Sequence, residues 1–305
     1  MSTETPTESA DTDEFNDSTV ESSSTNQQDD PTTDQSPDVE GASSSEEDET
    51  DTPDTTGPPL TLRAAIQSEP LKNILRALRA TVDEARVKID ETGIRVRAVD
   101  PANVAMDDLE LGAGAFESYE AREGTIGVNL NRLWDAVNLS GKDDLVQLFL
   151  DPETRKLVVN VDELEFRIAC LDPATIRAEP DLPDLDLPAS VTLTRESLQR
   201  GVKAADLIAD HVVFRMDTDE SVFHIEAAGD IDTVDLELTG AHLDEVTAAE
   251  ASSTFSLDYL KRLVRTIPAG ASVTVEVGVD FPTVLSYDLV DGAGSMSRML
   301  APRIE

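Results

Sequence analysis

The chain has 305 residues, 63 acidic against 24 basic side chains, a formal net charge of −39, one cysteine and three histidines. The single cysteine excludes an internal disulfide framework and a Cys-based zinc site. No run approaches the roughly 18 apolar residues of a membrane span, and Met1 is not followed by a secretion signal, so we expect a cytoplasmic protein of about two domains.

The first 59 residues differ in composition from the rest. They contain 18 acidic residues and no Lys or Arg. Because they also lack apolar surface to offset the entropy of ordering, we predict a disordered acidic tail over 1–59. Residues 60–305 still hold 45 acids against 24 bases, and arginines outnumber lysines 18 to 6, which is typical of a salt-adapted protein.

From residue 60, short alternating strands are broken by amphipathic helices. In the first half, helices are expected at 70–82 and 129–139. Strands are expected at 60–66, 86–90, 93–99, 104–111, 115–121, 145–150, 156–161 and 164–171. The segment 172–188 carries four prolines and is predicted to connect two domains, because proline cannot join a central strand.

The second half repeats this order. Leu71–Leu111 aligns with Leu198–Leu238 at an offset of 127 residues, without a gap. One offset that aligns helices and strands indicates a duplicated α+β domain, predicted over 60–171 and 189–305. The expected helices are 195–208 and 256–267, and the expected strands are 189–194, 212–217, 221–227, 232–239, 271–277, 283–290 and 295–301.

The four predicted helices are the basic part of this acidic chain. Their 49 residues hold ten bases and four acids, and the bases lie away from or beside the apolar stripes. Solvated helices often carry such residues. A surplus on three of four helices nevertheless favours a shared anionic partner, most simply a nucleic-acid backbone bound without sequence specificity.

Other functions have weaker support. His211, His224 and His242 are scattered without metal spacing, and no glycine-rich phosphate loop is present. The linker acids Asp181, Asp184 and Asp186 lack calcium-loop spacing. We therefore expect no catalysis, no metal and no cofactor. A scaffold without a DNA role is a further alternative, against which the basic helices argue.

Several motifs resemble the proliferating cell nuclear antigen family, the archaeal and eukaryotic DNA sliding clamps. They are Leu71–Leu78, Val99–Val104, Ile126–Leu130 and the C-terminal Leu300–Glu305. The resemblance covers about 60–305, and the acidic composition suggests a haloarchaeal member. An alternative within the resemblance is a checkpoint-type clamp or a heterotrimer subunit acting as a DNA-repair scaffold.

The resemblance implies a homotrimeric ring that encircles duplex DNA and acts as a processivity factor. Its implied partners are DNA polymerase, clamp loader, flap endonuclease and DNA ligase, which bind through a short motif with a Gln, an aliphatic residue and two aromatics. In α-helix two of the family, Asp135 and Asn138 replace lysines of many relatives. The DNA-facing residues implied are Lys72, Arg76, Arg79, Arg132, Arg200, Lys203, Lys261, Arg262 and Arg265.

The resemblance also implies an apolar pocket for the partner motif, beneath the connector. Neighbouring subunits are expected to join through the strands at 164–171 and 232–239, because unpaired strand edges are sticky. The pocket residues implied are Val99, Val104, Met106, Ile176, Pro282, Met299, Ala301, Pro302 and Ile304.

Overall fold

The computed structural model describes residues 61–180 and 185–303. The predicted tail over 1–59 lies outside the described residues, as do Asp181, Asp184 and Ile304. Within the described ranges, no helix is long and apolar enough to cross a bilayer.

The first half contains two helices among short strands. The helices are α1 (Ser68–Arg79) and α2 (Leu130–Val137), and a 3-10 turn, η1, spans Ala113–Ala115. The strands are β1 (Leu62–Gln67), β2 (Glu84–Asp90), β3 (Gly93–Val99), β4 (Ala105–Gly112), β5 (Ser118–Ala121), β6 (Gly124–Asn129), β7 (Leu145–Asp151), β8 (Lys156–Val161) and β9 (Leu164–Ala169).

The second half has the same composition of elements. It follows the connector, which holds the 3-10 turn η2 (Pro173–Thr175), and contains α3 (Arg195–Ala205), α4 (Leu257–Thr266) and η3 (Val290–Gly292). The strands are β10 (Ala189–Thr194), β11 (His211–Asp217), β12 (Val222–Ala228), β13 (Thr233–Leu238), β14 (Leu243–Thr247), β15 (Ala251–Ser256), β16 (Ser272–Val277), β17 (Thr283–Leu289) and β18 (Gly294–Leu300).

The two halves repeat at the offset seen in the sequence. Strand β10 begins and ends 127 residues after β1, and the same offset relates β11 to β2 and β15 to β6. The predicted duplicated α+β fold is therefore confirmed. The domain boundaries 60–171 and 189–305 stay predictions.

Three strands, β6, β14 and β15, lie where the sequence pattern predicts none. The sequences of β6 and β15 are rich in glycine, serine and threonine, and β14 is exposed along four of its five residues. Without apolar alternation these segments carry a weak strand signal, and pairing with β2, β10 and β11 creates them. The predicted helices at 70–82 and 195–208 also end three residues early, at Arg79 and Ala205.

All strand pairs within the sheets are antiparallel, and one sheet joins the two halves. A five-stranded sheet has the order β5-β1-β7-β8-β9, and a four-stranded sheet has the order β13-β12-β11-β15. The third sheet has nine strands in the order β14-β10-β16-β17-β18-β4-β3-β2-β6. It crosses between the halves because β18, the last strand, pairs with β4 over seven residues.

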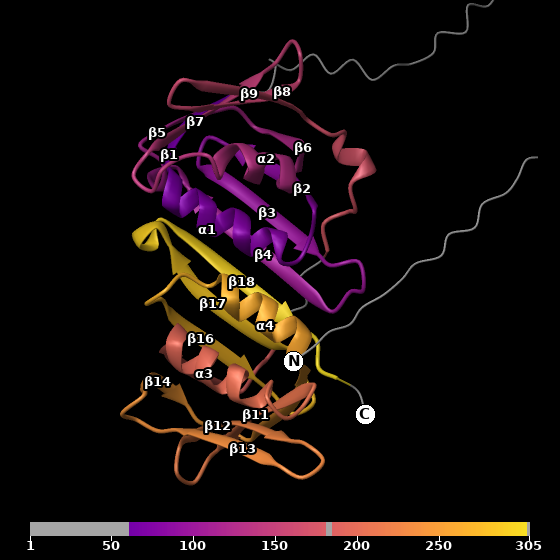
Figure 1. Cartoon of the computed structure of the whole chain (residues 1–305), viewed down its shortest axis with the longest axis vertical. Helices are drawn as coiled ribbons and strands as arrows, with labels where there is room; N and C mark the ends of the chain where they lie inside the picture. The colour runs from indigo at the N-terminus through magenta and orange to yellow at the C-terminus, as the bar shows by residue number, and fades with distance from the viewer. Residues whose placement is uncertain (1–60, 181–184, 304–305) are drawn as a thin grey trace, which may run out of the picture. The chain divides into compact units, whose positions relative to one another are not determined.

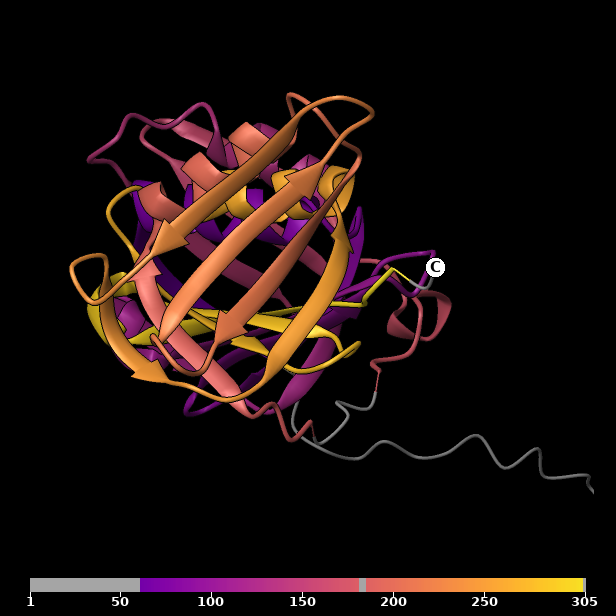
Figure 2. The ribbon, with the colours of Figure 1, turned by 90° about the horizontal axis from the view of Figure 1, so that it is seen from below.

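The four helices form one row. Helix α1 contacts α2, α3 contacts α4, and α1 contacts α4, so the row runs α2, α1, α4, α3 (Figure 1). The row lies to one side of the sheets (Figure 2). Each helix buries its apolar stripe, such as Leu71, Ile74 and Leu78 of α1, and leaves its other side toward solvent.

A buried ion pair holds the two halves together where β18 meets β4. The side chains of Arg298 and Asp107 are both 0% exposed, and Arg298 Nε lies 2.8 Å from Asp107 Oδ1. The same guanidinium donates to the main-chain oxygens of Ala77 at the end of α1 and Leu263 in α4, at 2.7 and 3.1 Å. One side chain thus links two helices and two strands from both halves.

Candidate functional site

The cationic side chains of the helix row are mostly accessible. They protrude from the side of each helix opposite the buried stripe. Arg79 and Lys261 are half-buried, and the fully exposed members are Arg76, Arg132, Arg200, Lys203, Arg262 and Arg265.

Aromatic rings orient three of these arginines. The guanidinium carbons of Arg76 and Arg79 lie 5.3 and 4.9 Å from the ring centre of Trp134 in α2. The guanidinium carbon of Arg262 lies 4.4 Å from the ring centre of Tyr259. Stacking fixes the cation without neutralising it, so the charge stays available to an anion.

Lys261 is the cation of this set that is most involved in local pairing. Its Nζ lies 2.6 Å from Asp206 Oδ1 and 3.4 Å from Asp258 Oδ1. The hydrogen bond to Asp206 is the main reason that the pKa of Lys261 is raised. The nearby Lys203, Arg262 and Arg265 line the same groove between α3 and α4, a hollow of about 730 Å³.

Lys72 does not belong to this surface, which corrects the expectation from the sequence. The residue is 8% exposed, and its Nζ donates to the main-chain oxygen of Ser140 at 2.6 Å. Lys72 lies beside the apolar stripe of α1, and its stem follows that stripe inward. Its charge therefore satisfies the chain end after α2. Asp135 and Asn138 are exposed on α2 and dilute the positive charge there.

An apolar row crosses the other face of the nine-stranded sheet. The strand registers place Val99 opposite Met106, Met106 opposite Met299, and Met299 opposite Val284. All four are half-buried. The structure thus brings together three predicted pocket residues and adds Val284, which the outward-facing alternation of β17 could have identified.

The C-terminal segment borders this row. The main-chain nitrogen of Ala301 donates to the oxygen of Val104 at 2.8 Å, and that of Arg303 donates to Thr254 at 2.7 Å. Val104, Ala301 and Pro302 are half-buried, as is Pro282 beside the exposed Phe281. The placement of these residues is compatible with one rim around the apolar row. The predicted pocket residue Ile304 lies outside the described part of the chain.

Ile176 lies elsewhere on the sheet, which corrects a second expectation. Its main-chain oxygen accepts from Nε and Nη2 of Arg86 on β2, and its side chain packs on Gly127 of β6. Ile176 is buried there because Gly127 has no side chain to fill the space. The next connector residue, Arg177, instead reaches the turn after Val99, where Nη1 donates to the Asp100 main-chain oxygen at 2.9 Å.

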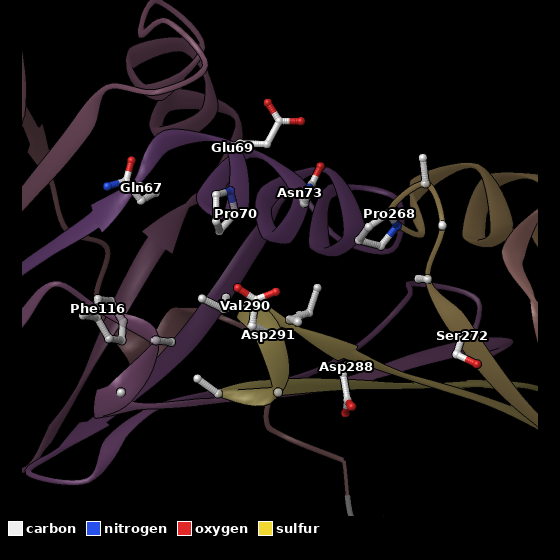
Figure 3. Close-up of a pocket in the computed structure, with 18 of the residues that line it drawn as sticks. Gln67, Glu69, Pro70, Asn73, Phe116, Pro268, Ser272, Asp288, Val290 and Asp291 are labelled. Atoms are coloured by element: carbon white, nitrogen blue, oxygen red, sulfur yellow. The ribbon is translucent and has the colours of Figure 1, made fainter.

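A hollow of about 870 Å³ between the two halves lies apart from both surfaces (Figure 3). It is lined by the start of α1, the loop after α4 and the turn η3. The lining includes Glu69, Glu117, Asp288 and Asp291 and has no basic residue. None of the predicted site residues lines it, so this hollow has no place in the two candidate surfaces.

Among the residues that the structure describes, His224, Glu226 and Asp235 form a group of metal-type ligands within 4.8 Å of one another. His224 Nδ1 lies 3.0 Å from Asp235 Oδ1, and Glu226 Oε1 accepts from Arg215 Nη2 at 2.6 Å. These side chains satisfy one another as an ion-pair cluster on the outer surface of β11, β12 and β13. The sequence spacing gave no sign of this grouping, because it spans three strands.

The comparisons with known proteins agree with this architecture. The model of the proliferating cell nuclear antigen N-terminal domain matches residues 62–171. The DNA polymerase sliding clamp of Natronomonas pharaonis is 47% identical over 243 residues, which cover 80% of this chain and 98% of that relative. The Halobacterium salinarum sliding clamp is 46% identical over the same length, with the same coverage.

Two solved structures extend the similarity. The A. fulgidus PCNA bound to the C-terminal region of FEN-1 has a TM-score of 0.76 and 38% identity, covering 80% of this chain and 99% of that one. PCNA of Thermococcus kodakaraensis has a TM-score of 0.74 and 27% identity, covering 79% and 100%. The duplicated fold and these similarities define the class of protein, a DNA sliding clamp. The chain belongs to the proliferating cell nuclear antigen family.

Proposed function

We propose that three identical copies of this chain close into a ring around duplex DNA and hold replication and repair enzymes on it as a processivity factor. The observation that carries this proposal is the pair of strands β9 and β13, each at the end of its sheet. They occupy the places that β18 and β4 occupy in the other half, and β18 and β4 pair within the chain. The proposed function needs no catalytic residue, metal or cofactor.

The duplication predicts the register of the junction between copies. Leu148 and Val275 are equivalent, and two strands further along the register they lead to Phe166 in β9 and Arg298 in β18. Phe166 therefore takes the place of Arg298. Asp107, the partner of Arg298, is equivalent to Val234 of β13. We expect Phe166 of one copy to lie opposite Val234 of the next.

The chemistry of these edges supports their pairing. Leu164 of β9 is 48% exposed, and Phe166, Val234 and Leu236 are half-buried in the single chain. By the same equivalence Leu164 faces Leu236, so two apolar pairs would be buried between copies. Each copy offers both edges, so identical copies join head to tail and close as a ring.

The helix row would face the DNA, because the sheets of successive copies continue one another around the outside. The exposed Arg76, Arg132, Arg200, Lys203 and Arg265 would contact phosphates without reading bases. At high salt the Debye length falls to about 3 Å at 1 M, so such contacts are weak. Encirclement, more than charge, is expected to retain the ring.

The apolar row on the outer side is the proposed docking site for client proteins. The A. fulgidus relative is bound to the C-terminal region of FEN-1. For this chain we propose flap endonuclease, DNA polymerase, DNA ligase and clamp loader as clients. Their two aromatic side chains would cover Met106, Met299 and Val284, and the segment after Leu300 would pair with the client backbone.

The decisive experiment is light scattering after size exclusion in high salt. The expected mass is three times the 32.9 kDa of the chain. Leu164→Asp buries a charge at the proposed junction and is expected to yield monomers. Leu207→Asp, at a leucine 85% exposed elsewhere, is the matched control and should stay trimeric. Monomeric wild-type protein at micromolar concentration would refute the ring.

A second measurement addresses encirclement and the client pocket separately. Rings loaded on closed circular DNA should dissociate far more slowly than rings on the same plasmid after linearisation, and equal lifetimes would contradict topological retention. Met299→Asp should abolish binding of a client-motif peptide while the trimer mass is unchanged. Unaltered peptide affinity would rule out the apolar row as the docking site.

A further inference from the structure

The turn between β3 and β4 is organised by one buried carboxylate. Asp100 is 5% exposed, and its Oδ1 accepts from the main-chain nitrogens of Val104 and Ala105 at 2.7 and 2.8 Å. Its Oδ2 accepts from the main-chain nitrogen of Ala102 at 3.1 Å. The carboxylate therefore determines the shape of the whole turn over residues 100–104.

The carboxylate has one further partner, and it comes from the other half of the chain. The hydroxyl of Tyr259 in α4 donates to Asp100 Oδ2 at 2.9 Å. The hydrogen bond to Asp100 is the main cause of the raised pKa of Tyr259. Tyr259 also lines the cationic groove between α3 and α4, with the Arg262 guanidinium stacked on its ring. The turn is thus attached directly to the helix row.

The same turn borders the apolar row on the outer side. Val99, the residue before Asp100, belongs to that row, and the Val104 main-chain oxygen accepts from Ala301 of the C-terminal segment. Arg177 of the connector donates to the main-chain oxygen of Asp100 and to the Asn103 side chain. The connector, the apolar row and the C-terminal segment therefore all meet at this turn.

We propose that Tyr259 is a positioning residue of the client pocket: its hydroxyl, held by a helix of the DNA-facing row, keeps the 100–104 turn in the shape that client peptides bind. This inference rests on the proposed docking site. Tyr259 acts through Asp100 and does not touch the client. The two functional surfaces are thereby mechanically linked, so that movement of α4 reaches the pocket through one hydrogen bond.

The test removes only the hydroxyl, with Tyr259→Phe, and leaves the ring under Arg262. The matched control is Tyr119→Phe, because the Tyr119 hydroxyl donates to main-chain oxygens of Asp90 and Gly93 at the opposite end of β3. Loss of a hydrogen bond to a charged acceptor should weaken client-motif peptide binding about tenfold in Tyr259→Phe. The control should bind as wild type does, although both variants lose one hydroxyl contact.

Hydrogen exchange of the trimer gives a readout that needs no peptide. In Tyr259→Phe the amides of Val104, Ala105 and Ala301 should exchange about tenfold faster, while Tyr119→Phe leaves them unchanged. If wild type fails to bind the peptide, the docking site is wrong, and exchange alone decides the role of Tyr259. Wild-type exchange rates in Tyr259→Phe, or peptide affinity equal to that of the control, would overturn the inference.

Discussion

The buried pair of Arg298 and Asp107 offers the most direct test of how the two halves are joined. Arg298→Met keeps the volume of the side chain but leaves the Asp107 carboxylate without its cation in a fully buried site. Removing one partner of such a pair typically costs about 3–5 kcal/mol. The main-chain oxygens of Ala77 and Leu263 also lose a donor, which places the expected cost at the upper end of that range.

Urea unfolding in high salt, followed by the fluorescence of Trp134, measures this cost. For a domain pair of this size, about 3–5 kcal/mol corresponds to a fall in melting temperature of roughly 10 °C. The double variant Arg298→Met with Asp107→Leu removes both charges, so it should recover most of the loss, because buried ion pairs can be replaced by apolar residues at little cost. A single variant that loses under 1 kcal/mol, or a double variant that is worse than the single, would refute this reasoning.

Further outcomes are expected. Lys72→Met should leave DNA retention unchanged in a salt-titrated binding assay, since the Lys72 ammonium is committed to Ser140, and a weaker complex would return Lys72 to the DNA-facing set. Arg265→Gln should weaken DNA binding at low salt and reduce the salt slope by about one, and an unchanged slope would exclude a phosphate contact. Burial raises the pKa of Asp100, but hydrogen bonds from Ala105, Tyr259 and Val104 outweigh it and the pKa is lowered. The stabilisation by the Asp100 carboxylate is therefore present above pH about 4 and is lost as pH falls further, so the stability difference between wild type and Asp100→Asn should shrink in acid. A difference that does not vary with pH would contradict this assignment.

The sequence was sufficient to predict the duplication and the helices, because these depend on periodic apolar residues. Leu71, Ile74 and Leu78 repeat at helical spacing, and the offset of 127 aligns whole elements. Lys72 shows the limit of that reasoning. A residue at the margin of an apolar stripe can turn either way, and Ser140, a hydrogen-bond acceptor 68 positions away, decides its direction.

The missing parts of the client surface have a similar cause. Val284 joins Met299 only through a pairing register, and Arg177 replaces Ile176 at the pocket rim because Gly127 makes room for the isoleucine side chain. Asp107 is one of two adjacent aspartates among 63 acids, and nothing in the local pattern separates it from Asp108. Each of these roles is assigned by a partner that is distant in the chain.

The unequal chemistry of the two kinds of junction has a mechanical consequence for the proposed ring. Inside each copy, the contact between β18 and β4 is cemented by a desolvated charge pair and by the covalent chain itself. Between copies, only strand pairing and a few apolar side chains such as Phe166 oppose separation. A loading machine that pries the ring apart would therefore split it at three predetermined seams, and every split would leave a two-domain arc whole and ready to reseal.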